Sequence, residues 1–252
     1  MDQTVRPVAL ITGAAAGIGR ATALALARAG YETCATDLDE ASLQSLATHA
    51  QRLNLRVHVA AADLLQDQQL QAVVDRVGRE FGRLDALVHS AGLFPRKSFS
   101  ESTVEDLDRV MGVNFRAAFR LAALSIPLMT DGGAMIFLTS GSGLLAAVAD
   151  PMQTEFSLYG ASKAALDRWA LGIAAELSRL GVTVNTLTPG AFVLTPGVAA
   201  LGLRETEERP SISAEVVAEA IAWLAGSPPD GPCGQRLSAT EFRQSWGPRA
   251  RG

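Results

Sequence analysis

A glycine-rich loop constrains the fold of this chain more than any other feature. Residues 8–12 form a short apolar run, and Gly-Ala-Ala-Ala-Gly-Ile-Gly follows it directly over residues 13–19. The glycines of this loop are Gly13, Gly17 and Gly19. Because glycine has no Cβ, the backbone here can turn tightly and let a ligand approach the main chain. The amphipathic pattern that begins at Ile18 indicates a helix whose free N–H groups favour an anion. A strand, a glycine turn and a helix start predict a site for a dinucleotide pyrophosphate.

The rest of the chain alternates short apolar runs with longer amphipathic segments. We expect strands over residues 8–12, 32–37, 57–61, 86–90, 134–139, 183–187 and 235–238. We expect helices over residues 18–29, 40–51, 67–81, 104–129, 158–180 and 214–224. This alternation is typical of βαβ units, and right-handed crossovers place their helices on both faces of the sheet. The predicted fold class is α/β: a doubly wound, Rossmann-type parallel sheet.

Composition narrows the classes of protein and of partner. A length of 252 residues and a hydrophobic fraction of 48% fit one domain over residues 1–252 with a large core. The net charge is −4 and no basic run occurs, so we expect neither a nucleic-acid nor a membrane partner. The chain lacks a long apolar run and an apolar leader, which predicts a cytoplasmic protein. Scattered histidines and cysteines predict no metal site.

A tyrosine and a lysine are four residues apart in Tyr-Gly-Ala-Ser-Lys, residues 159–163. On a helix these two side chains share one face, so the charge of Lys163 is expected to lower the pKa of Tyr159 from its usual value of about 10. Such a phenol can act as a general base on an alcohol or as a general acid to a carbonyl. An amphipathic helix can carry this pair without any function, but its occurrence beside the glycine loop favours catalysis.

The spacing Gly-x-x-x-Gly-x-Gly, with Tyr159-x-x-x-Lys163 downstream, resembles the short-chain dehydrogenase/reductase family of the compact classical type, over residues 7–238. The resemblance implies an NAD(P)-dependent oxidoreductase that interconverts a secondary alcohol and a ketone. It also implies a homotetramer or homodimer. Carried over position by position, it implies the catalytic residues Asn114, Ser140, Tyr159 and Lys163. Asn114 would hold a water molecule that links Lys163 to solvent. Ser142 is the alternative to Ser140 as the catalytic serine.

The resemblance and the residues together also give a cofactor site. Asp37 ends the second predicted strand, 18 residues after Gly19, where a carboxylate can bind ribose hydroxyls and would repel a 2′-phosphate. A helix-capping role for Asp37 is the alternative, and Asp39 could compete with it. Ala16 offers no phosphate partner, so NAD is favoured over NADP. The predicted cofactor-binding residues are Gly13, Gly17, Ile18, Gly19, Asp37, Asp63, Leu64, Ser90, Ala91, Gly92, Tyr159, Lys163, Pro189, Gly190 and Val193.

Several segments depart from the family pattern. His89-Ser90 stands where the family usually has two amides, and we interpret His89 as a partner in a local network rather than a catalyst. The interval from Ser140 to Tyr159 is 19 residues, longer than usual, and we place the additional residues at 150–156. Residues 192–212 should form an irregular substrate lid. Thr195 comes one residue later than the family's carboxamide-binding threonine. The predicted substrate-contacting residues are Ser140, Ser142, Phe94, Met152 and Phe156, and the apolar ones among them favour an apolar alcohol or ketone.

Two other functions are compatible with the sequence. One is an NADP(H)-dependent carbonyl or 3-oxoacyl reductase. The other is a catalytically silent NAD-binding sensor or scaffold, which would have no need to retain all four catalytic residues. The sequence does not specify the substrate, the direction of reaction or its stereochemistry, and it gives no role for the chain after Ser238.

Overall fold

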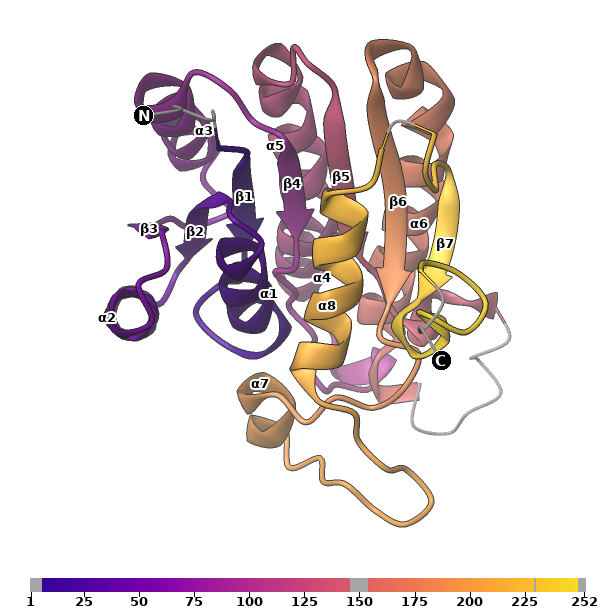
Figure 1. The fold of residues 1–252 in the computed structure, drawn as a ribbon. Coiled ribbons are helices and arrows are strands. Elements are labelled where there is room, and N and C mark those ends of the chain that lie inside the picture. The colour runs from indigo at the N-terminus through magenta and orange to yellow at the C-terminus, as the bar shows by residue number, and fades with distance from the viewer. Residues whose placement is uncertain (1–5, 146–153, 229, 249–252) are drawn as a thin grey trace.

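Seven short strands form a single parallel sheet, and the central ones are runs of buried, mostly apolar residues. The computed structural model describes residues 6–145, 154–228 and 230–248. The strands are β1 Val8–Thr12, β2 Glu32–Asp37, β3 Val57–Ala61, β4 Ala86–His89, β5 Gly133–Leu138, β6 Val182–Thr188 and β7 Gln235–Ser238. Their order is β3-β2-β1-β4-β5-β6-β7, and every pairing is parallel (Figure 1). The predicted doubly wound α/β fold is therefore confirmed.

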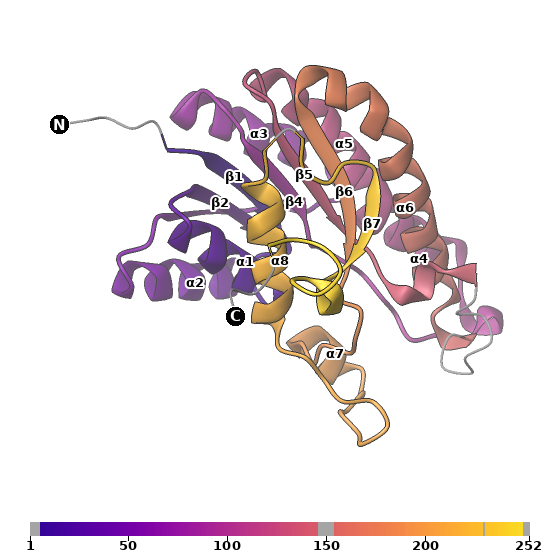
Figure 2. The ribbon, with the colours of Figure 1, turned by 45° about the vertical axis from the view of Figure 1, so that its right-hand side comes forward.

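Helices cover both faces of this sheet. They are α1 Gly17–Arg28, α2 Glu40–Arg52, α3 Asp67–Phe81, α4 Val104–Met111, α5 Ala117–Ser125, α6 Ser157–Leu177, α7 Pro196–Ala200 and α8 Ala214–Ala225. Two buried clusters result because successive residues of a strand face opposite sides of the sheet. Ile11 and Ile136 pack under α1, α2 and α8, whereas Leu10 and Phe137 pack under α3, α5 and α6 (Figures 1 and 2). Among the described residues, no helix is long and apolar enough to cross a membrane.

The strand order reverses at the centre of the sheet. From β1 the chain adds β2 and β3 on one side, and it then crosses to β4 on the other side. The connections that leave β1 and β4 therefore diverge at their carboxyl ends, which is where open α/β sheets bind ligands. Helix α7 lies beyond this carboxyl edge, at the lower end of the molecule in Figure 1.

The described elements differ from the predicted ones chiefly in two places. The helix expected over residues 104–129 is interrupted by a π-helical stretch, Gly112–Arg116, and closes with a 3₁₀ turn, Ile126–Leu128. The lid expected to be irregular contains α7, which Thr195 caps by accepting a hydrogen bond from the Val198 N–H. Smaller shifts affect other elements: β4 stops at His89, one residue early, and both ends of β5 and of β6 differ by one residue from the predicted bounds.

Candidate active site

A cavity of about 450 Å³ lies at the carboxyl edge of the sheet. Its walls come from the segments that follow β1 through β6 and from the start of α7. It is lined by all of the predicted cofactor-binding residues except Gly190, namely Gly13, Gly17, Ile18, Gly19, Asp37, Asp63, Leu64, Ser90, Ala91, Gly92, Tyr159, Lys163, Pro189 and Val193. The predicted residues thus converge although they are distributed over most of the chain.

The glycine loop is packed so closely that side chains would not fit. Gly13 has a φ of +68°, and a Cβ at this position would lie 2.7 Å from the Ala91 backbone. A Cβ at Gly19 would lie 2.1 Å from the Gly13 carbonyl oxygen. The first turn of α1 therefore rests directly on the loop, and the free N–H groups at its N-terminus border the cavity, as a pyrophosphate site requires.

Carboxylates mark the β2–β3 end of the cavity. The Asp37 side chain accepts hydrogen bonds from the Ala15 and Asp39 backbone N–H groups, each at 3.1 Å, and it lines the cavity. Asp39 instead caps α2, because its Oδ1 accepts a hydrogen bond from the Ser42 N–H at 3.0 Å. The structure thus separates the two aspartates, which the sequence could not do. Leu38, whose side chain is exposed, also lines this end of the cavity.

Tyr159 and Lys163 lie one turn apart on α6, at the β5 end of the cavity. The Lys163 Nζ lies 5.7 Å from the Tyr159 ring centroid and donates a 2.8 Å hydrogen bond to the Leu138 carbonyl oxygen. A side-chain hydrogen bond joins Tyr159 to Ser140. Ser142 reaches this group through its backbone, whose N–H donates to the Ser140 Oγ at 3.2 Å. Of the two candidate serines, Ser140 is therefore the one that the structure joins to the phenol.

The pKa of Tyr159 differs from the expected direction. Burial raises the pKa of Tyr159, and the hydrogen bond with Ser140 opposes this effect only in part. Burial also lowers the pKa of Lys163 to about 8, while the Asp167 carboxylate acts in the opposite direction. The expectation that Lys163 lowers the Tyr159 pKa is wrong for this structure, because desolvation of the phenol outweighs any effect of the ammonium.

Asn114 lies in the π-helical stretch, fully buried and outside the lining of the cavity. Its Oδ1 accepts a hydrogen bond from the Leu93 N–H at 2.7 Å, and its Nδ2 donates to the Leu93 carbonyl and the Ser162 Oγ, both at 2.8 Å. The side chain thus ties the segment after β4 to α6. The water-binding role that the family resemblance implies for Asn114 stays a prediction.

His89 connects β4 to β1 and to the π-helical stretch after α4, in the kind of local network that the sequence predicted. Its Nε2 lies 3.1 Å from the Val113 carbonyl oxygen, and its Nδ1 lies 3.0 Å from the Thr12 Oγ1. Since a carbonyl can only accept, the Nε2 carries the proton and the Nδ1 accepts one from Thr12. Thr12 in turn accepts a hydrogen bond from the Ala91 N–H at 3.3 Å. Burial, together with the charge of Lys163, lowers the pKa of His89 to about 3, which keeps the ring neutral.

This neutral histidine predicts a pH dependence of stability. Because the pKa of His89 falls from 6.5 to about 3 on folding, the unfolded chain binds more protons between these values. Stability therefore decreases as the pH falls below about 6.5. Between pH 7 and pH 5.5 we expect His89→Asn, which cannot titrate, to lose about 1 kcal/mol less stability than the unsubstituted protein. Urea unfolding at both pH values measures this difference, and equal losses would contradict a neutral, buried His89.

Aromatic and lid residues close the catalytic end of the cavity. The Phe94 ring meets the Tyr159 ring edge-on, with 5.7 Å between centroids. Gly197 of α7 packs against Phe94, since a Cβ there would lie 3.1 Å from the ring. Thr195 packs against Gly17 in the same way, at 2.8 Å. The lid thus touches both the glycine loop and the aromatic ring that covers the phenol.

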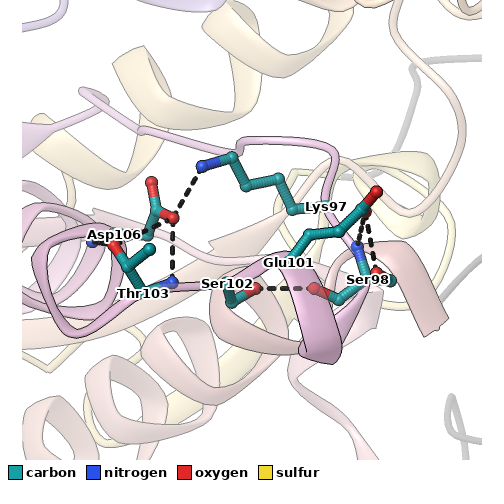
Figure 3. Close-up of polar contacts among 6 residues, drawn as sticks. All are labelled: Lys97, Ser98, Glu101, Ser102, Thr103 and Asp106. Atoms are coloured by element: carbon teal, nitrogen blue, oxygen red, sulfur yellow. Dashed lines mark hydrogen bonds and ion pairs between the residues drawn. The ribbon is translucent and has the colours of Figure 1, made fainter.

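Polar contacts fix the loop that carries Phe94 (Figure 3). Ser98 and Glu101 bond reciprocally around a short 3₁₀ turn, and Thr103 and Asp106 do the same at the start of α4. The Lys97 Nζ adds a 2.7 Å ion pair to Asp106. Two successive capping boxes therefore hold the segment between β4 and α4, one wall of the site, in a defined shape.

The other predicted substrate-contacting residues do not line the cavity or lie outside the described residues. Phe156 is buried at the start of α6 and does not line the cavity, and Ser140 and Ser142 do not line it either. Met152 lies outside the described residues. Sequence reasoning missed Arg109 and Val113, which line the cavity from the α4 region and belong to no motif. It also missed Leu65, which directly follows the predicted Asp63-Leu64 pair.

A glycine-loop cavity with a tyrosine–lysine pair at its far end is typical of Rossmann-type oxidoreductases. A family model for short chain dehydrogenases matches residues 7–205. The chain belongs to the short-chain dehydrogenase/reductase family, whose members are NAD(P)-dependent oxidoreductases.

Relatives cover most of its length. It is 34% identical over 191 residues to a 3-oxoacyl-(acyl-carrier-protein) reductase of Thermotoga maritima, covering 75% of each chain. It is 27% identical over 239 residues to a 7alpha-hydroxysteroid dehydrogenase of Escherichia coli K12, covering 92% of each. Among solved structures, a short-chain dehydrogenase of Shigella flexneri in complex with NADP is similar, with a TM-score of 0.80 and 25% identity over 95% of this chain and all of that one.

Proposed function

We propose that the protein is an NAD(H)-dependent oxidoreductase that interconverts a secondary alcohol and a ketone. The observation that carries this proposal is the hydrogen-bonded pair of Tyr159 and Ser140, with the Lys163 ammonium one turn away, at the far end of the cavity from Asp37. Such a group can exchange a proton with a substrate oxygen beside a nicotinamide.

The residues that line the cavity fit a nicotinamide dinucleotide. The glycine loop and the N-terminus of α1 would hold the pyrophosphate, since no Cβ obstructs its approach. Asp37 would bind the adenosine ribose, and Asp63 with Leu64 would flank the adenine. Pro189 and Val193, which follow β6, would border the nicotinamide. When bound, the cofactor supplies or accepts the hydride.

The proton is handled by residues of this chain. Ser140 would hold the substrate oxygen through its hydroxyl, and Tyr159 would donate a proton to it in ketone reduction or remove one in alcohol oxidation. The Lys163 ammonium would oppose the effect of burial on the phenol by its charge, and this charge is retained below its pKa of about 8. Asn114 and Phe94 would position these groups without taking part in the transfer.

The walls near Tyr159 support an apolar substrate. Leu93, Phe94 and Val193 line this end of the cavity, joined by Pro196 and Val198 of the lid segment. Among the described lining residues, the charged ones are Asp37, Asp63, Arg109 and Lys163, and of these Lys163 belongs to the catalytic end. An uncharged ketone or alcohol can enter such a pocket without leaving a buried charge unpaired.

One experiment tests the function directly. The purified protein is incubated with NAD or NADP and a panel of apolar secondary alcohols, and with NADH or NADPH and the matching ketones, while absorbance at the reduced nicotinamide band is followed. We expect turnover with NAD(H) exceeding that with NADP(H). Cofactor binding without turnover across the panel would favour the silent sensor. Turnover with NADPH alone would favour the reductase alternative, which the NADP complex of the Shigella flexneri relative supports.

Cofactor preference should depend on Asp37. Because its carboxylate faces the cavity and would repel a 2′-phosphate, we expect Asp37→Ala to weaken NADH binding by about tenfold and to leave NADPH binding unchanged or stronger. Fluorescence titration of the reduced cofactors measures both constants. Asp39→Ala is the matched control, since this residue caps α2 and should not alter the preference. Equal weakening of NADH and NADPH by Asp37→Ala would reject the choice of NAD.

The family resemblance also supports assembly into a homotetramer or homodimer. Phe119 on α5 is half exposed and contacts Trp169 of α6, so this face offers an apolar contact surface to a second copy.

A further inference from the structure

An ion pair lies behind the proposed catalytic group, on the side away from the cavity. Asp167 follows Lys163 by one turn of α6, and Arg236 projects from β7, the last strand of the sheet. The Arg236 Nε donates to the Asp167 Oδ2 at 3.0 Å, and its Nη2 donates to the Ser140 carbonyl oxygen at 2.9 Å. The Thr139 hydroxyl also donates to the Asp167 Oδ2, at 2.7 Å. The pair therefore links α6, the helix of Lys163, to Ser140, the hydrogen-bond partner of Tyr159.

Stability alone does not explain a charged pair at this position. The two side chains are 12% exposed for Asp167 and 23% exposed for Arg236, so both lose most of their hydration. The Asp167 Oδ1 is buried and has no hydrogen-bond partner among the described residues. Desolvation of such a pair commonly cancels the Coulomb attraction, and apolar residues of similar volume would pack as well or better. A carboxylate kept here at that cost points to a role for its charge.

The neighbours of Lys163 show what that role can be. Its Nζ contacts the Leu138 carbonyl of β5, and the titratable side chains of Tyr159 on α6 and His89 on β4 also interact with it. Both are neutral at physiological pH, since the pKa of Tyr159 is raised and that of His89 is about 3. Asp167 supplies the negative field that opposes the desolvation of Lys163. Arg236 in turn holds Asp167 through a 3.0 Å ion pair.

We propose that Asp167 and Arg236 are positioning residues for the catalytic lysine: Arg236 holds Asp167 ionised in the interior, and the Asp167 charge keeps the buried Lys163 protonated. The proposal deepens the proposed function, on which its catalytic consequence rests. Neither residue belongs to the glycine loop or to the tyrosine–lysine motif, and neither lines the cavity.

The composition of the chain allows a direct test. The only lysines are Lys97 and Lys163, so protein that carries lysine labelled with ¹³C at Cε gives two signals, and Lys97→Arg assigns them. Titration of the Lys163 signal reports its pKa without any substrate or turnover. We expect Asp167→Asn to lower this pKa by about one unit or more, and Asp167→Glu to restore most of it. Glu219→Gln, which removes the carboxylate of an exposed ion pair on α8, should leave it unchanged.

Three further variants separate this role from a structural one. Arg236→Met should lower the Lys163 pKa as Asp167→Asn does, because an unpaired buried Asp167 becomes protonated. Arg236→Lys should restore it. The double variant Asp167→Leu with Arg236→Met replaces the whole pair by apolar side chains, so we expect it to keep the unfolding midpoint of the unsubstituted protein but not its Lys163 pKa. A Lys163 pKa that is unchanged in the double variant would overturn the proposal.

Activity then gives an independent reading. If the proposed function holds, Asp167→Asn should shift the pH limit of kcat that reports Lys163 to lower pH by the same amount as the NMR titration. A lysine pKa shift without any turnover in the unsubstituted protein would reject the proposed function and retain the inference about the charge. Turnover with an unshifted pH profile and an unshifted NMR pKa would reject the inference alone.

Discussion

Replacing Tyr159 by phenylalanine is expected to lower kcat by roughly 10³-fold while the protein still binds NADH. The substitution removes only the hydroxyl that is hydrogen-bonded to Ser140, so proton transfer to the substrate oxygen loses its donor. The ring that remains can keep its edge contact with Phe94, and Lys163 can keep its hydrogen bond to Leu138. The shape of the cavity should therefore persist. Steady-state kinetics and NADH fluorescence, on the same preparation, measure the two properties separately.

The chain offers a matched control for this variant. Its only other tyrosine, Tyr31, is also buried and donates a 2.9 Å hydrogen bond to the Ala225 carbonyl oxygen. Neither Tyr31 nor Ala225 lines the cavity. Tyr31→Phe should cost about 1 kcal/mol of stability, the usual value of one hydrogen bond, and leave kcat unchanged. Unaltered turnover in Tyr159→Phe would remove the proposed mechanism. Equal loss in both variants would show that the effect is structural.

The strands could be predicted closely because the central ones are buried along their length and appear as continuous apolar or β-branched runs. The bounds of β1, β2, β3 and β7 are as predicted, although β3 and β7 at the sheet edges are only partly buried. The left-handed glycines after α1 and α3, Gly30 and Gly82, were likewise predictable, since only glycine adopts φ values of +97° and +70° at low cost. The strand bounds and the glycine positions are thus determined by residues close together in the sequence.

The break between α4 and α5 could not be predicted in the same way. Residues 104–129 have a continuous helical pattern, and the local signals against it are the poor helix formers Gly112, Asn114 and Pro127. The π-helical stretch is stabilised instead by distant partners, because the Asn114 side chain bonds to Leu93, 21 residues away, and to Ser162, 48 residues away. A tertiary contact here overrides an intrinsic preference.

The candidate site also contains residues that local spacing predicts and residues that only the tertiary fold brings together. Gly13, Gly19, Tyr159 and Lys163 were predictable because short spacings place them on one turn or one helix face. Arg236 was not, because it reaches Ser140, 96 residues away, only through the register that pairs β7 with β6. The raised pKa of Tyr159 was also not predictable, since it depends on how deeply the fold buries the phenol.

Gly19→Ala is expected to weaken cofactor binding strongly. The added methyl carbon would lie 2.1 Å from the Gly13 carbonyl oxygen and 2.6 Å from its carbon, and both are backbone atoms that no rotamer change can move aside. The first turn of α1 would have to move away from the glycine loop, and these are the two elements proposed to hold the pyrophosphate. We expect NADH affinity to fall by about 100-fold, equivalent to about 3 kcal/mol.

The matched control for this substitution is Gly226→Ala at the end of α8. Gly226 has a negative φ, and the nearest atom to an added Cβ lies 3.7 Å away, so the same methyl group meets ordinary contacts there. Overpacking at Gly19 should also cost about 1–3 kcal/mol of stability, which urea unfolding without cofactor measures. If Gly19→Ala loses stability but binds NADH normally, the loop is structural and the pyrophosphate lies elsewhere. If it loses affinity beyond what partial unfolding accounts for, the close contact of α1 with the loop is what shapes the dinucleotide site.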